Sequence, residues 1–344
     1  MKKLNRIFGT AAAVAVMLFL AACSNASSGS NPAPQQPPAA PSDPAPTTTP
    51  APAPEQNNAQ STPVTLETPL TLEAAEAGSV VTFVNKATGP VTYKVNGGEA
   101  QTIASNSKGT ITLTNIGDKI EFFGNNTRYA TYLNNYSHIT CDKDCYVYGN
   151  IMSLINSEGF ESETTLTGDY AFLGLFEDNT TIKNKDGADL LLPATTLASY
   201  CYCNMFFGCR SLTIAPSLPA TTLAKACYAA MFYDCRSLTI APSLPATNLT
   251  QSCYGSMFSD CKSLATAPLL PANMLVQGCY AYMFHGCEIL NNITCLATNI
   301  SASECTDSWL EGVAVSGTFT KADGVTWPTG ISGIPSGWTV VDKQ

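Results

Sequence analysis

The sequence predicts an α/β solenoid of leucine-rich-repeat-like units, preceded by a small all-β, sandwich-like domain and a disordered, proline-rich tether. Three observations lead to this prediction. Cys209–Asp234 and Cys235–Asp260 match at 19 of 26 positions, short β-branched runs fill residues 64–148, and the segment before them is rich in proline. We expect five regions: a lipoprotein signal peptide at 1–22, a lipid-anchored linker at 23–63, the β domain at 64–148, the solenoid at 149–312 and a C-terminal cap at 313–344.

The amino-acid composition of the chain argues against several classes of function. The 344 residues include only 12% charged side chains, and the formal net charge is −9. This acidic balance argues against a nucleic-acid partner, because phosphate binding needs clustered Lys and Arg. The two histidines leave little room for a His-rich metal site or for most His-based catalysis. The 14 cysteines favour an oxidising compartment over a reducing cytosol.

The amino terminus predicts export. Lys2, Lys3 and Arg6 precede a short apolar run at residues 11–20, which is typical of a signal peptide. The run ends in Leu20-Ala21-Ala22-Cys23, which resembles the lipobox of bacterial lipoproteins. The resemblance implies cleavage before Cys23 and a thioether-linked lipid with acyl chains such as palmitate. It places the chain in the bacterial cell envelope, anchored to the outer membrane or cell surface. The alternative is an ordinary secretory cleavage site with a chance cysteine.

The tether and the β domain follow in order. Eleven of the 22 prolines lie between Pro32 and Pro63, in a segment without apolar periodicity, so no core is expected there. Alternating, β-branched segments then predict strands at residues 80–84, 91–95, 110–114 and 119–123. Asn96-Gly97-Gly98 predicts a hairpin turn after the second of them.

The repeated unit predicts its own local structure. A period of 26 residues lies in the leucine-rich-repeat range. Residues 211–214 predict a short strand with Leu212 and Ile214 on one face, and two prolines then turn the chain. Residues 223–232 show helical spacing, with Cys227, Met231 and Phe232 expected to point inward. Atypical units at both ends are typical of caps.

The repeated blocks carry a resemblance to a known family. Tyr-x-x-Met-Phe recurs from Tyr202, Cys-x-Ser-Leu from Cys209, and Leu-Pro-Ala from Leu192. Over residues 146–340 the chain resembles the BspA-like leucine-rich-repeat surface proteins of bacteria. That resemblance implies a cell-surface adhesin that takes part in protein binding. It does not identify a particular ligand.

The cysteines allow several states. A local disulfide between Cys141 and Cys145 is favoured over a zinc site with His138, because one His and two Cys are an incomplete ligand set. In the repeats, bonds within a unit, bonds between units and buried free thiols all remain open. The possible disulfide cysteines of this region are Cys201, Cys209, Cys227, Cys235, Cys253, Cys261, Cys279, Cys287, Cys295 and Cys305.

Candidate binding residues form two columns. One holds small polar side chains of the expected strand, namely Thr213, Thr239 and Asn291. The other is basic and holds Arg210, Arg236 and Lys262, which could meet an acidic partner or be balanced by Asp234 and Asp260. Residues 186–189 (Asp-Gly-Ala-Asp) predict a simple turn rather than a calcium-binding loop.

The expected function is a non-catalytic binding or adhesion module for an extracellular protein or glycan. The alternatives are a structural envelope or spacer protein and, third, an extracellular glycan-processing enzyme. No catalytic motif is recognised, so we expect no enzyme, no cofactor and no metal.

Overall fold

The computed structural model describes residues 65–343, which belong to one compact unit, Pro63–Gln344. The signal peptide, Cys23 and the whole of the expected tether lie outside the described residues. The elements are β1 (Leu70–Ala74), β2 (Ser79–Val84), β3 (Val91–Val95), β4 (Gln101–Ile103), β5 (Lys108–Leu113), β6 (Lys119–Gly124), β7 (Ala130–Tyr132), β8 (Asn135–Tyr136), β9 (His138–Cys141), β10 (Cys145–Asn150), η1 (Ile151–Leu154), η2 (Phe160–Ser162), β11 (Ile182–Lys183), β12 (Leu190–Leu191), β13 (Asn292–Cys295), β14 (Thr318–Ala322) and β15 (Thr339–Lys343).

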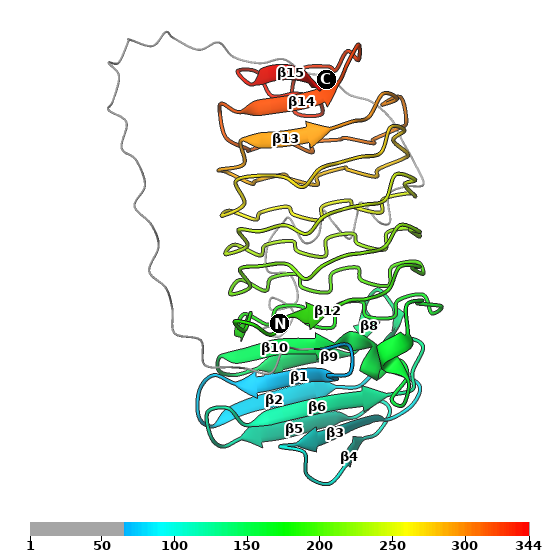
Figure 1. The fold of residues 1–344 in the computed structure, drawn as a ribbon, viewed down its shortest axis with the longest axis vertical. Coiled ribbons are helices and arrows are strands. Elements are labelled where there is room, and N and C mark those ends of the chain that lie inside the picture. The colour runs from blue at the N-terminus through cyan, green and yellow to red at the C-terminus, as the bar shows by residue number, and fades with distance from the viewer. Residues whose placement is uncertain (1–64, 344) are drawn as a thin grey trace, which may run out of the picture. The chain divides into compact units, whose positions relative to one another are not determined.

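The first part is built from two main sheets that share one core. One sheet runs β11-β10-β1-β6-β3-β4, with β12 also paired to β10, and the other runs β5-β2-β9 (Figure 1). Phe83 of β2 and Phe122 of β6 meet edge to face between the sheets, with ring centroids 5.3 Å apart. The four predicted strands are confirmed as β2, β3, β5 and β6, with the predicted bounds for β3 and shifted ends for the other three. The predicted turn is also present, because Asn96 and Gly97 both have positive φ.

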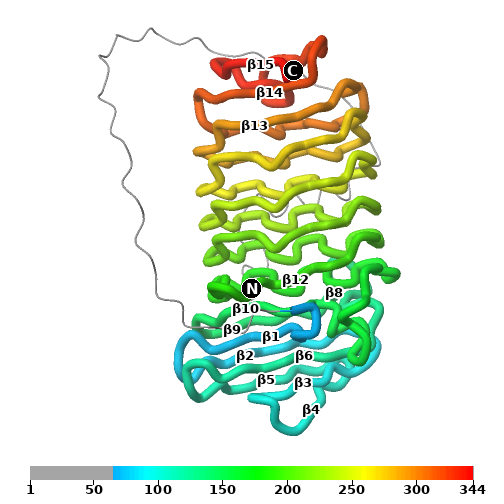
Figure 2. The backbone as a smooth tube through the Cα atoms, in the orientation of Figure 1, coloured from blue at the N-terminus to red at the C-terminus, as the bar shows by residue number. Residues whose placement is uncertain are grey.

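The second part is a stack of coils that continues the larger sheet (Figure 2). β11 and β12 of the first coil pair in parallel with β10 of the β domain. Later coils lie one above another at the 26-residue spacing, as the parallel bridge between Ile214 and Ile240 shows. The final coils are joined by the parallel sheet β13-β14-β15. One hydrophobic cluster runs through the described residues from Leu70 to Trp338.

The predicted α/β class is wrong. The described residues contain no α-helix, and their only helical segments are the short 3-10 turns η1 and η2. Residues 223–232, expected to be helical, form successive turns instead. The protein is therefore mainly β structure and turns where it is described, and the leucine-rich-repeat-like architecture is not observed.

A four-residue backbone period explains the error. Ala226, Ala230 and Asp234 adopt left-handed φ values of 51°, 51° and 56°, which no α-helix tolerates. The core-facing pairs Cys227-Tyr228 and Met231-Phe232 therefore recur every four residues. Over ten residues this period is nearly indistinguishable from the 3.6-residue period of a helix. The inward positions were predicted correctly, but the backbone was not.

The hydrogen bonds alternate along each run of turns. Tyr228 donates its N–H to Cys253 of the next coil at 3.0 Å, and Ala230 donates to Gly255 at 2.8 Å. The amides between them close local turns, as Ala229 does by donating to Ala226 at 3.2 Å. From Ala226 to Cys235 every backbone N–H is thus paired without a helix or a strand.

Identical side chains stack in columns inside the coils. The Tyr202 and Tyr228 ring centroids lie 5.7 Å apart and those of Phe206 and Phe232 5.5 Å apart, and the rings of each pair are stacked nearly parallel. Because each coil buries these rings only against its neighbours, an isolated coil would have no core.

The expected strand at residues 211–214 is also corrected. Only Ile214 makes a β-bridge, to Ile240, and no strand forms. Leu212 is buried as predicted, but Ile214 is 44% exposed and lies on the outer surface. Pro216 interrupts the pairing because it has no N–H to donate.

Candidate functional site

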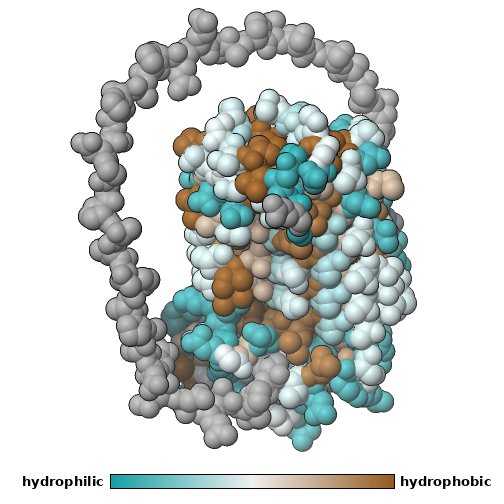
Figure 3. Space-filling view, turned by 45° about the horizontal axis from the view of Figure 1, so that its top comes forward, coloured by the Kyte–Doolittle hydropathy of each residue, from teal (hydrophilic) through white to brown (hydrophobic). Residues whose placement is uncertain are grey.

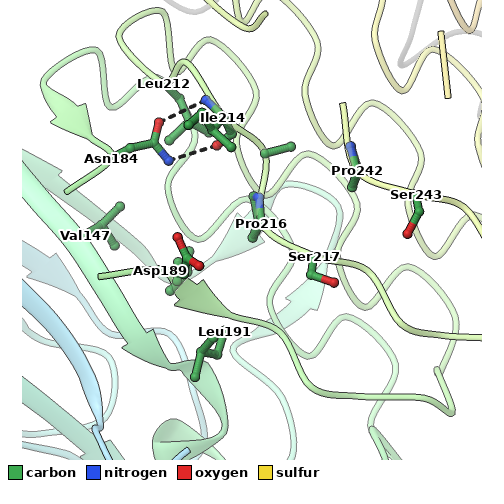
Figure 4. A pocket seen from close by; sticks show the side chains of 12 residues that line it. Val147, Asn184, Asp189, Leu191, Leu212, Ile214, Pro216, Ser217, Pro242 and Ser243 are labelled. Atoms are coloured by element: carbon green, nitrogen blue, oxygen red, sulfur yellow. Dashed lines mark hydrogen bonds between the residues drawn. The ribbon is translucent and has the colours of Figure 1, made fainter. Parts of the chain in front are cut away.

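A groove of about 300 Å³ crosses the outside of the first coils, next to β10 (Figure 4). Its apolar lining comes from Val147 of β10, Leu190 and Leu191 of β12, Leu212, Ile214, Ala215, Pro216 and Pro242. Its polar lining is Asn184, Asp189, Ser217 and Ser243. An apolar lining with a few converging polar groups is the usual composition of a binding site.

Asn184 holds one wall of this groove in place. Its Oδ1 accepts the backbone N–H groups of Thr213 at 2.9 Å and Ile214 at 3.0 Å, and its Nδ2 donates to the Ile214 carbonyl at 2.9 Å. The side chain thus supplies the pairing that a neighbouring strand would supply. Figure 4 shows the two bonds to Ile214, which position this exposed side chain at the groove.

Asp189 gives the groove an unpaired negative charge. Asp189 is an exposed residue, and no described side chain donates a hydrogen bond to its carboxylate. The nearby cations are already engaged, since Lys185 binds Glu73 at 2.6 Å and Lys183 binds Asp144. The groove therefore favours a basic or hydrogen-bond-donating group near Asp189.

The predicted polar column lies on the exposed surface, but only its first member is near the groove. Thr213, Thr239 and Asn291 are all exposed. Thr213 Oγ1 lies 3.1 Å from Asn184 Oδ1, whereas Asn291 lies three coils further along the stack. Figure 3 shows apolar and polar patches interspersed on the face it presents.

The predicted basic column is an ion-pair ladder in the structure. Arg210 and Arg236 both bind Asp234 at 2.6 Å. Lys262 binds Asp260 at 2.9 Å and Glu288 at 2.8 Å. These cations are paired within the chain, which agrees with the balanced alternative.

The candidate disulfide cysteines of the coils are buried free thiols in the structure. One column has a clear role in packing: its Sγ atoms donate to phenylalanine carbonyls of the preceding coil. These contacts join Cys209 to Phe176, Cys235 to Phe206, Cys261 to Phe232 and Cys287 to Phe258, at 3.0–3.1 Å. The thiol thus satisfies a carbonyl within the core.

Sequence reasoning missed the groove and one buried acid. Burial raises the pKa of Glu177 to about 7, while a hydrogen bond to Tyr136 opposes this shift. The surroundings of this acid are tightly packed, because a Cβ added at Gly174 would lie 2.6 Å from the Tyr136 ring. Glu177 Oε2 is buried and has no hydrogen-bond partner. This carboxyl is not part of the groove lining.

Residues 65–343 contain no cluster of three His, Cys, Asp or Glu side chains that could hold a metal ion. Within the same range, no helix has the length and apolarity needed to cross a membrane.

Comparisons with known proteins identify no relative of this chain. No protein-family model matches the chain, and no curated protein or solved structure is significantly similar to it.

Proposed function

We propose that the chain is a lipid-anchored bacterial envelope protein that acts as a non-catalytic binding or adhesion module. The groove carries this proposal, because it is an open, apolar site with an unpaired carboxylate on a scaffold whose core is filled by side chains. The lipobox ending at Cys23 and the resemblance to BspA-like surface proteins are the sequence support for an exposed location.

The lining favours a polypeptide segment as the ligand. Proline and aliphatic side chains form the floor, and none of the twelve lining residues is aromatic. Ser217 and Ser243 supply hydroxyls at neighbouring coils, and Asp189 supplies the charge. We therefore expect an extended peptide with a basic side chain rather than a glycan.

Binding to an array of extracellular-matrix proteins and glycans tests this function. Ile214→Asp places a charge on the groove, whereas Ile289→Asp is a matched control at a comparably exposed isoleucine outside it. We expect saturable binding that Ile214→Asp reduces at least tenfold and Ile289→Asp leaves unchanged. If no protein or glycan binds, the protein is a structural spacer instead, and turnover of a glycan would identify an enzyme.

Location is tested separately from binding. Cys23→Ser should abolish lipid labelling of the chain and release it from the membrane fraction. Protease treatment of intact cells should degrade the wild-type protein if it faces outward. Labelling that survives Cys23→Ser would contradict the predicted anchor.

A further inference from the structure

Two thiols outside the groove differ from the other cysteines of the described residues. Cys141 ends β9 and Cys145 begins β10, so a loop of three residues separates them. β9 belongs to the three-stranded sheet and β10 to the seven-stranded sheet. The two cysteines are hydrogen-bonded to each other through their side chains. They therefore meet where the chain passes from one sheet to the other.

The loop between them is held in a defined conformation. Asp142 accepts the Val80 N–H at 2.7 Å, and Lys143 Nζ donates to the Ala77 carbonyl at 2.8 Å. On the far side of the loop, Asp144 accepts the Ala75 N–H at 3.0 Å and pairs with Lys183. The two thiols are thus kept side by side in the folded protein.

The Cys141–Cys145 pair also has the chemistry that oxidation requires. Cys141 is only partly buried, so a small oxidant can reach it. The hydrogen bond from Cys141 lowers the pKa of Cys145, and the same bond raises the pKa of Cys141. The thiolate form is the nucleophile in disulfide exchange. In the coils, by contrast, burial raises the pKa of every thiol, for example that of Cys287 to about 12.

We propose that Cys141 and Cys145 form a disulfide that joins the two sheets of the β domain, while the coil thiols stay reduced. The oxidant is a small-molecule or protein disulfide. Cys141, the more accessible thiol, passes its proton to Cys145 along their hydrogen bond and attacks one of the oxidant's sulfurs, which forms a mixed disulfide and releases one thiol. Cys145 then attacks Cys141 Sγ, which forms the Cys141–Cys145 bond and releases the second thiol. The two protons of the pair end on the released thiols, so the pair loses two electrons and the oxidant gains them.

Mass spectrometry of the full chain treated with oxidised glutathione tests this proposal. After quenching, unfolding and alkylation, we expect the peptide with both cysteines to be two hydrogens lighter and free of alkyl label. The eleven other described cysteines should be fully alkylated. Alkylation of Cys141 and Cys145, a persistent glutathione adduct on either, or disulfides among the coil cysteines would each overturn the proposal.

A stability measurement gives independent support. The oxidant should raise the thermal midpoint of the wild-type protein, because the cross-link restricts the unfolded chain. Cys141→Ser should abolish this rise, while Cys253→Ala, which removes a coil thiol, should retain it. An equal rise in Cys141→Ser would show that another bond is responsible.

Discussion

Left-handed residues determine the backbone of the coils. Three recur in each coil, four residues apart, and alanine occupies two of these positions at Ala226 and Ala230. A left-handed conformation costs a residue with a Cβ about 1–2 kcal/mol. In other coils glycine fills the positions equivalent to these alanines, as Gly278 and Gly174 do. The fold therefore tolerates strain at alanine because its neighbours in the stack hold the turn.

The pair Ala229 and Ala230 tests this strain. Both side chains are buried, but only Ala230 has positive φ. Replacing either by glycine removes one buried methyl group, and only Ala230→Gly also relieves strain. We expect Ala230→Gly to be more stable than Ala229→Gly by about 1–2 kcal/mol. Chemical denaturation of both variants measures the difference, and equal stability would show that residue 230 is not left-handed.

Buried tyrosine hydroxyls give a second prediction at this scale. Tyr228 Oη is buried without a hydrogen-bond partner, whereas Tyr129 Oη donates to the Leu154 carbonyl at 2.7 Å. We expect Tyr228→Phe to leave stability unchanged or raise it by about 1 kcal/mol, because an unsatisfied group is removed. Tyr129→Phe should lower stability by about 1 kcal/mol. Thermal unfolding compares them, and a larger loss in Tyr228→Phe would reveal a hydroxyl partner.

At the scale of secondary-structure elements, the Glu177 side chain of the first coil interacts with Tyr136 of β8. Tyr136 of β8 and Asp178 are the groups that act on its carboxyl besides burial. The pKa of Glu177 is raised from 4.5 to about 7, so the folded state binds this proton more tightly than the unfolded state. The resulting stability is complete below about pH 4.5 and is lost as pH rises through 7.

We therefore expect Glu177 to contribute up to about 3 kcal/mol of pH-dependent stability across this window. Glu177→Gln, which stays neutral, should remove that dependence and be more stable than wild type at pH 8. Denaturation at pH 5 and pH 8 measures both. The same slope in the variant would assign the pH dependence to other groups.

A prediction for the groove concerns charge. Asp189→Asn keeps the shape of the groove but removes its unpaired carboxylate. We expect it to weaken binding of a basic peptide about three- to tenfold and to reduce the salt dependence of that binding. Titration at low and high salt measures the effect once a ligand is found. Unchanged affinity and salt dependence would place the basic group of the ligand elsewhere.

Sequence reasoning succeeded where one local pattern decides the structure. Alternation in residues 80–84 and 119–123 placed two strands correctly, and the repeat columns placed Met231 and Phe232 in the core. It failed where two structures share a pattern, because period four and period 3.6 coincide over one short run. It also missed the groove, since Val147, Asp189 and Pro242 meet only when the coils stack. No local signal in the sequence brings them together.

At the scale of the whole described unit, the β domain is the base on which the coils build. β10 pairs with β1 of the domain and with β11 and β12 of the first coil, so the sheet crosses from one part to the other. The hydrophobic cluster is continuous across the same junction. The binding surface we propose lies at this junction, because Val147 and Leu191 line it from both sides.

The central claim is that each coil is a run of turns bonded to the next coil, rather than a helix. Backbone chemical shifts of the full chain, measured by NMR across residues 223–234, test it most directly. The structure predicts left-handed shifts at Ala226, Ala230 and Asp234, with no unbroken helical run between them. A continuous set of helical shifts from Leu223 to Phe232 would contradict the account.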